Sequence, residues 1–170
     1  MKRFFGMLLC VVLLCGALGA AADETLRSGN YAYVLIEDGS AVITGWDGTE
    51  TELSIPGQLD GRIVTGIGQA AFSHCDRLTA VFIPLGITRI GPDAFCDCIS
   101  LTDLTVPSGV TEIGSAAFSG CASLTTVVIP DSVREIGDRA FRGCSAELVI
   151  FAELDSFAAR YCQENGLNVQ

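Results

Sequence analysis

The sequence predicts an α/β repeat solenoid, a right-handed coil whose successive turns each add one strand to a parallel ladder. The first observation is a segment written four times, as "IGQAAFSHC", "IGPDAFCDC", "IGSAAFSGC" and "IGDRAFRGC", each copy starting 23 residues after the last. The second is a short alternation of apolar and polar residues between the copies, which is typical of a half-buried strand. The third is that one such coil buries its apolar face only when neighbouring coils stack on it.

The repeat keeps the same residue type at each position that we expect to face the core. These residues are Phe72, Phe95, Phe118 and Phe141, then Cys75, Cys98, Cys121 and Cys144, then Leu78, Leu101 and Leu124. A fixed period of about 20 to 29 residues with L-x-x-L-x-L spacing is typical of a leucine-rich repeat. Catalysis instead needs different residue types that converge on one point, so the repeat is architectural.

The segment "LTTVVIP", which ends at Pro130, shows how one coil is built. Val127 and Ile129 are predicted to point inward, and the residue before each of them outward, as in a strand of period two. Pro130 ends the strand, because proline has no N–H to donate to the ladder. The segment "IGDRAFRGC" then turns the chain, and we expect a short helical turn there.

We expect caps at both ends of the repeats, because a solenoid must cover its open ends. The repeats take residues 53–152, about four in number, with Leu53 in the first ladder strand. In residues 23–52, two alternating runs meet at the dipeptide "DG", residues 38–39, which is a strong signal for a β-hairpin.

Residues 153–170 are expected to form a helical cap. Asp155 or Ser156 can supply the N-cap, and Gly166 stands where a glycine commonly ends a helix. A short strand would follow over residues 167–169. One apolar face of the helix is predicted, formed by Phe157, Ala158, Tyr161 and Cys162.

The first 22 residues are interpreted as a secretory signal peptide, because a basic start, an apolar run and the small residues "AAA" precede Asp23. An uncleaved anchor is one alternative, since the apolar stretch approaches the ~20 residues of a membrane span. A lipoprotein signal is another, although Cys10 and Cys15 each follow a leucine where a small residue is usual. The protein is therefore expected to be secreted or at the cell surface, or periplasmic in a cell with two membranes.

The charge of the chain excludes some partners. Removal of residues 1–22 takes two of the 10 basic residues and none of the 20 acidic ones, which leaves a formal net charge of −12. So acidic a chain repels phosphate groups, so we expect neither nucleic acid nor an anionic membrane surface as a partner.

Six cysteines remain after cleavage. The four repeat cysteines should form an inward column at ~4.8 Å spacing, wider than the ~3.8 Å between the β-carbons of a disulfide. We interpret them as buried, weakly donating thiols. Cys162 should pack on the cap helix, with a bridge to Cys144 as an alternative. Cys96 takes a position held elsewhere by serine or arginine, which predicts an exposed thiol open to oxidation or to a bond with another chain.

No pattern points to catalysis, a metal or a cofactor. The one histidine, His74, stands at a variable loop position, and no G-x-S-x-G, phosphate-loop or H-E-x-x-H motif occurs. The carboxylates stand at variable repeat positions, as on a soluble surface. His74, Cys96 and Cys98 fall short of the four ligands that structural zinc usually takes.

Recognition is the role that remains, on the outward residues of the ladder strands. We call these residues the strand face; they are Ala80, Phe82, Asp103, Thr105, Thr126, Val128, Val149 and Phe151. Several of these residues are apolar although they are not expected to face the core, which is typical of a binding surface. The alternative is that β-branched and aromatic residues stand there only because strands favour them. Five strands at ~4.8 Å span about 19 Å, which suits a peptide, a loop or a few sugar rings.

The pattern C-x-x-L-x-x-V-x-I-P-x-x-V-x-x-I-G-x-x-A-F resembles the BspA-like leucine-rich repeat family of secreted and surface bacterial proteins, over about residues 53–152. The resemblance implies an extracellular protein that acts in adhesion or protein binding. The chain departs from the pattern twice. The first repeat carries the insertion "GQLDGRI" after Pro56, and the last has Glu147 where leucine is expected.

These observations predict a non-catalytic binding module that recognises a protein or a glycan, in adhesion or in contact with a host or envelope component. The alternative is a structural component of the cell envelope that self-associates through Cys96 or the strand face. A hydrolase is a third, more distant interpretation.

Overall fold

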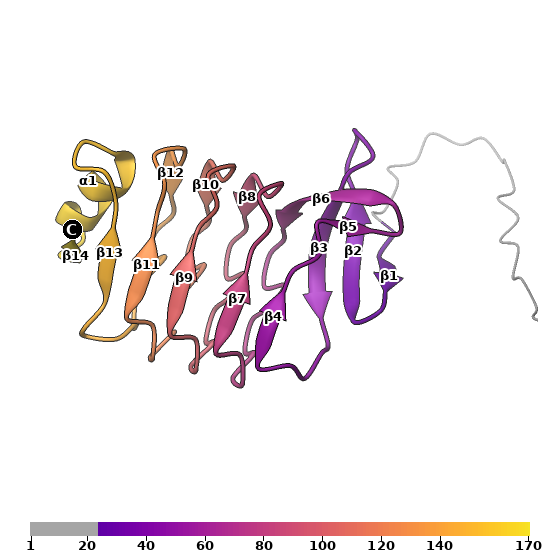
Figure 1. Ribbon diagram of the computed structural model, residues 1–170, viewed down its shortest axis with the longest axis horizontal. Coiled ribbons are helices and arrows are strands. Elements are labelled where there is room, and N and C mark those ends of the chain that lie inside the picture. Colours follow the sequence, from indigo (N-terminus) through magenta and orange to yellow (C-terminus); the bar gives the residue numbers. More distant parts are fainter. Residues whose placement is uncertain (1–23) are drawn as a thin grey trace, which may run out of the picture.

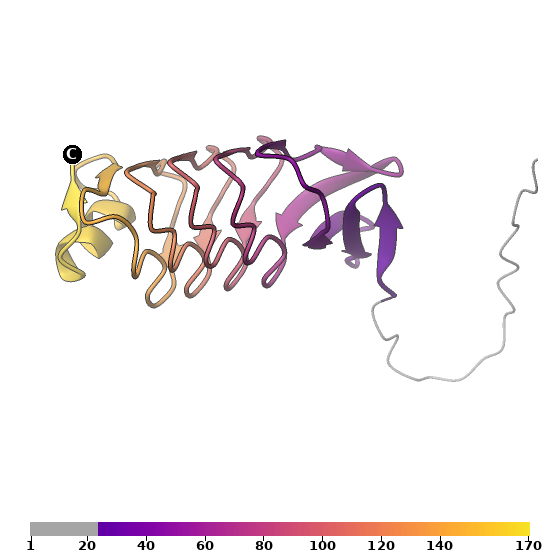
Figure 2. The same cartoon turned by 90° about the horizontal axis from the view of Figure 1, so that it is seen from below.

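The computed structural model describes residues 24–170. The interpretation of residues 1–22 as a signal peptide, with Cys10 and Cys15, lies outside the described residues. In the described part, successive coils stack into an elongated row with one cap at each end, and the strands run side by side across it (Figure 1). The same row, turned by 90°, is seen from below in Figure 2.

The predicted parallel ladder is present. It has six strands in the order β14-β13-β11-β9-β7-β4. Their bounds are β4 Glu52–Ser54, β7 Ala80–Phe82, β9 Asp103–Thr105, β11 Thr126–Val128, β13 Val149–Phe151 and β14 Asn168–Val169. Leu53 lies in the first of them and Val127 is fully buried, as expected. Strand β14 follows the cap helix and pairs with β13, so it closes the ladder.

A second parallel ladder, which the sequence reasoning missed, runs along another side of the coils. It joins β6 Arg62–Ile67, β8 Arg89–Ile90, β10 Glu112–Ile113 and β12 Glu135–Ile136. Three of these strands are two residues long. Two residues are too few for an alternation to be detected.

The predicted helical turn in each "IG-x-x-A-F" segment is wrong, because these segments are non-helical turns. Each turn holds two residues at positive φ, for example Asp93 at 54° and Asp97 at 59°. Left-handed residues at this spacing interrupt a helix. The backbone N–H groups bond instead to the next coil, as Phe95 N does to the carbonyl oxygen of Ala117 at 2.8 Å.

The core of the solenoid is a column of phenylalanine rings. Phe72, Phe95, Phe118 and Phe141 stack with centroids 5.0, 5.4 and 5.5 Å apart and planes within 9° of parallel. Trp46 closes the column at one end in a tilted contact, and Tyr161 closes the other end in an edge-to-face contact. The 23-residue period thus places equivalent rings directly over one another in successive coils.

The N-terminal cap contains the predicted hairpin, formed by β2 Tyr31–Leu35 and β3 Ala41–Trp46. Strand β1, Leu26–Ser28, adds to its outer side, and β3 continues in parallel into β6. The insertion "GQLDGRI" makes a small hairpin of its own, in which β5 Gln58–Leu59 pairs with β6. Asp60 and Gly61 take positive φ at its turn, as a two-residue type I′ turn requires.

The C-terminal cap is the predicted helix, α1 Phe157–Glu164. Ser156 is its N-cap, since its hydroxyl accepts the N–H of Ala159 at 3.0 Å. Gly166 has φ 67°, which ends the helix as expected. Cys162 is fully buried beneath it. Within residues 24–170, no helix has the length and apolar character to cross a membrane.

Candidate binding face on the strand ladder

All eight residues of the strand face lie on the same side of one sheet, in two rows. Parallel register makes Glu52, Ala80, Asp103, Thr126 and Val149 successive partners across the strands. The second row pairs Ser54 with Phe82, and Thr105 with Val128 and then Phe151. Strand β4 therefore adds Glu52 and Ser54 to the face. The sequence predicts Leu53 in this strand with its side chain inward. In a strand of period two, the residues on either side of it must then point outward.

The second row is the apolar part of the strand face. The exposed fractions are 61% for Phe82, 38% for Val128 and 41% for Phe151. Thr105, between Phe82 and Val128, is exposed as well. These side chains stand outside the core, so burial within the solenoid does not explain their apolar character.

Leu85 extends this apolar surface, and the sequence reasoning overlooked it. It follows the proline that ends the strand and is 76% exposed. A groove of about 400 Å³ lies between it and the strands, and Ile83, Asp103 and Pro107 also line it. The sequence does hold a signal for this residue: the equivalent turn position in the next coil is the polar Ser108, so a leucine there is unusual for a solvent-facing turn.

Charge on the strand face is of one sign. Its only ionisable residues are Glu52 and Asp103, and neither forms an ion pair among residues 24–170. The arginines that do pair, Arg27 and Arg89, have their partners within the other sheet and its cap. The face thus combines a row of apolar side chains with two unpaired carboxylates.

The four repeat cysteines are free, as expected. Cys98 and Cys121 are buried as predicted, but Cys75 and Cys144, at the two ends of the column, are only partly buried, so the prediction of a fully buried column is wrong at its ends. Cys98 donates its S–H to the carbonyl oxygen of Phe72, and Cys121 and Cys144 make the same bond one and two coils further on. Contact with the Cys75 thiol, together with burial, raises the pKa of Cys98. Cys162 is also free, so the alternative bridge from Cys144 is not formed.

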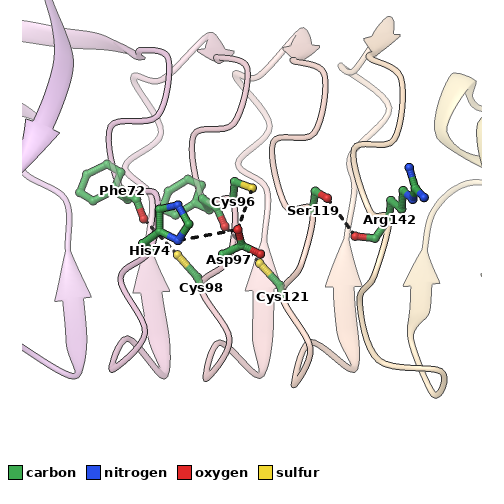
Figure 3. A network of polar contacts seen from close by, with 9 residues as sticks. Phe72, His74, Cys96, Asp97, Cys98, Ser119, Cys121 and Arg142 are labelled. Carbon is green, nitrogen blue, oxygen red and sulfur yellow. Dashed lines mark hydrogen bonds and ion pairs between the residues drawn. The ribbon is translucent and has the colours of Figure 1, made fainter.

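Cys96 is only partly exposed, and it lies beside His74 and Asp97 on the turn side of the coils (Figure 3). Its Sγ is 3.6 Å from Oδ2 of Asp97, and Nδ1 of His74 is 3.7 Å from the same oxygen. Partial burial and the carboxylates of Asp97 and Asp93 raise the pKa of the Cys96 thiol. A thiol held in its protonated form is a poor nucleophile. Among residues 24–170, no group of three potential ligands is arranged to hold a metal ion.

The sequence profile described as "BspA type Leucine rich repeat region" matches residues 52–165, in six copies. The comparison with curated proteins gave no match.

Three solved structures of bacterial leucine-rich repeat proteins are similar to this chain. The protein from Bacteroides capillosus is 30% identical, with a TM-score of 0.68 over 76% of this chain and 98% of the other. The protein from T. pallidum is 30% identical, with a TM-score of 0.61 over 75% and 71%. The protein from Bacteroides ovatus is 27% identical, with a TM-score of 0.62 over 74% of this chain but only 36% of the other.

Proposed function

This chain belongs to the BspA-type leucine-rich repeat family, and on that premise we propose that it is a secreted, non-catalytic module that binds a protein partner on its strand face. Leucine-rich repeat proteins are typically protein-interaction modules. The observation that carries the proposal is the exposed apolar row of Phe82, Val128 and Phe151, continued by Leu85.

A protein partner suits the strand face better than a glycan does. The second row offers exposed apolar side chains, and such a surface gains most from burial against other apolar side chains. Sugar rings would need several polar groups converging on one place. The outward polar groups of the apolar row are instead single hydroxyls, on Ser54 and Thr105.

The test is a capture experiment with two double variants of the chain from residue 23 onward, which contains the whole described fold. Phe82→Asp with Val128→Asp places two charges on the strand face. Ile63→Asp with Ile99→Asp is the matched control, because both residues are exposed and lie off the two rows. Extracellular-matrix proteins, a glycan array, envelope extract and the chain itself are the immobilised probes.

We expect a protein that is retained by the parent and by the control pair and lost by the strand-face pair. Retention by all three forms would contradict the proposal, as would binding of glycans alone. Binding only to the chain itself would favour the self-associating envelope component. Circular dichroism and unfolding midpoints establish that all forms are equally folded.

A further inference from the structure

The groove beside Phe82 combines apolar lining residues with one carboxylate, and this combination favours one kind of partner side chain. Ala80 is the small residue of its row, and its register partners on the two sides are Glu52 and Asp103. Of these three residues, Ala80 and Asp103 line the groove, and the short side chain of Ala80 leaves room beside the carboxylate of Asp103. Phe82, Leu85 and Pro107 form the apolar part of the lining.

Asp103 supplies charge at this groove without an internal partner. Its carboxylate accepts no hydrogen bond from another side chain among residues 24–170 and takes part in none of their ion pairs. It is exposed, and its neighbour across the next strand is the uncharged Thr126. An exposed carboxylate at the edge of a groove lined by apolar and aromatic side chains favours a cation with a long aliphatic stem.

We propose that this groove binds an arginine side chain of the protein partner, with its stem against Leu85 and Pro107 and its guanidinium at Asp103. This inference rests on the proposed function and names the chemistry of the partner. Arginine fits better than lysine, because its planar group pairs with a carboxylate through two hydrogen bonds and also stacks on an aromatic ring such as Phe82.

The charge of the whole chain supports a foreign, basic partner over a second copy. The chain from residue 23 onward carries a net charge of −12. Two copies of so acidic a chain repel each other, and the strand face offers no basic residue to offset this. A partner with an exposed basic segment is attracted to the same face.

The probe is N-acetyl-arginine methylamide, titrated into ¹⁵N-labelled chain from residue 23 onward and followed by amide chemical shifts. We expect saturable shifts centred on Ala80, Phe82 and Asp103, with a dissociation constant on the order of 1 mM. The lysine analogue should bind more weakly, and the norleucine analogue, which keeps the stem without charge, should bind at least about fivefold more weakly.

Two variants decide whether the carboxylate acts. Asp103→Asn should weaken the arginine probe about fivefold and remove its advantage over norleucine. Asp138→Asn removes the same charge from an exposed turn and should leave the affinity unchanged. Equal effects of the two variants, equal binding of arginine and norleucine, or the absence of shifts in the groove would each overturn the inference.

The two proposals fail separately. A partner that is captured through Phe82 and Val128 but is insensitive to Asp103→Asn would retain the binding module and reject the arginine site. Sedimentation that shows a dimer of the parent, lost in Phe82→Asp with Val128→Asp, would assign the face to a second copy and also reject the site.

Discussion

The Sγ of Cys98 lies 3.1 Å from the carbonyl oxygen of Phe72, one coil earlier in the solenoid. Cys121 and Cys144 repeat this contact with the phenylalanines of their own preceding coils, at 3.2 Å each. The thiols therefore bond coil to coil while remaining unbridged. The cysteine column is a structural feature of the core, and it predicts how substitution and alkaline pH affect stability.

Replacement of Cys121 by alanine should lower the free energy of unfolding by about 1–2 kcal/mol, because a weak hydrogen bond is lost and a small cavity remains. Urea unfolding under reducing conditions measures this. Cys96→Ala is the control, since that side chain is partly exposed and its thiol lies against the carboxylate of Asp97 rather than a backbone carbonyl of another coil. Equal midpoints for both variants would contradict an internal role for the column.

Alkaline pH should destabilise the fold through its buried thiols. Burial, with the Cys144 thiol nearby, raises the pKa of Cys121 to about 12 from an ordinary 9.0. Burial raises the pKa of Cys144 to about 11, and that of Cys162 to about 11. The folded state thus holds these protons more tightly than the unfolded chain. Their contribution to stability is complete below pH 9 and is lost as the pH rises toward 11 to 12.

The measurement is the urea denaturation midpoint of the parent and of Cys121→Val, taken at several pH values from 8 upward. Valine fills the site without a titrating group, so its stability should decline less steeply than that of the parent above pH 9. Parallel declines in the two proteins would show that Cys121 does not contribute to the alkaline loss.

Gly114→Ala should be strongly destabilising, by about 2–3 kcal/mol or more. A β-carbon on Gly114 would lie 2.6 Å from the carbonyl carbon of Gly91 in the adjacent coil, where the backbone has no room to move. Gly57→Ala is the matched control, because its nearest contact would be an ordinary 4.0 Å from Pro84. Thermal unfolding of both variants tests the difference, and similar losses would indicate that the coils separate easily.

Ser156→Ala should lower the stability by about 1 kcal/mol, because the N–H of Ala159 loses its side-chain acceptor. Asp155→Ala should have a smaller effect, since the Asp155 side chain does not cap the helix. Urea unfolding midpoints of the two variants decide which residue is the N-cap. A larger loss for Asp155→Ala would reverse the assignment.

Much of the fold could be predicted, because identical residues that recur at a fixed period must occupy equivalent positions in successive coils. Phe72 and its counterparts specify a stacked column, and the alternation around Val127 specifies which strand residues face inward. The same rule located the strand face through its register. The second ladder could not be predicted, since two-residue strands such as β8 carry no alternation, and their pairing depends on the coil above and below.

The requirement for a glycine after each repeat isoleucine is explained by the tertiary structure and not by the sequence pattern. The sequence displays its recurrence, but the close approach of Gly114 to Gly91 exists only when the coils are stacked. The left-handed conformation of residues such as Asp93 and Asp97 also depends on the stacking of the coils. Their conformation is set by hydrogen bonds to the next coil, which a single-repeat argument does not include.

The sequence by itself determined the repeat, both caps and the inward or outward direction of most strand residues, because periodicity and capping residues act locally or between equivalent positions. Only the tertiary structure decided that Leu85 and Asp103 share a groove with Phe82 and that Cys96 is partly shielded. These properties depend on distances between neighbouring coils, and such distances follow from packing rather than from spacing along the chain.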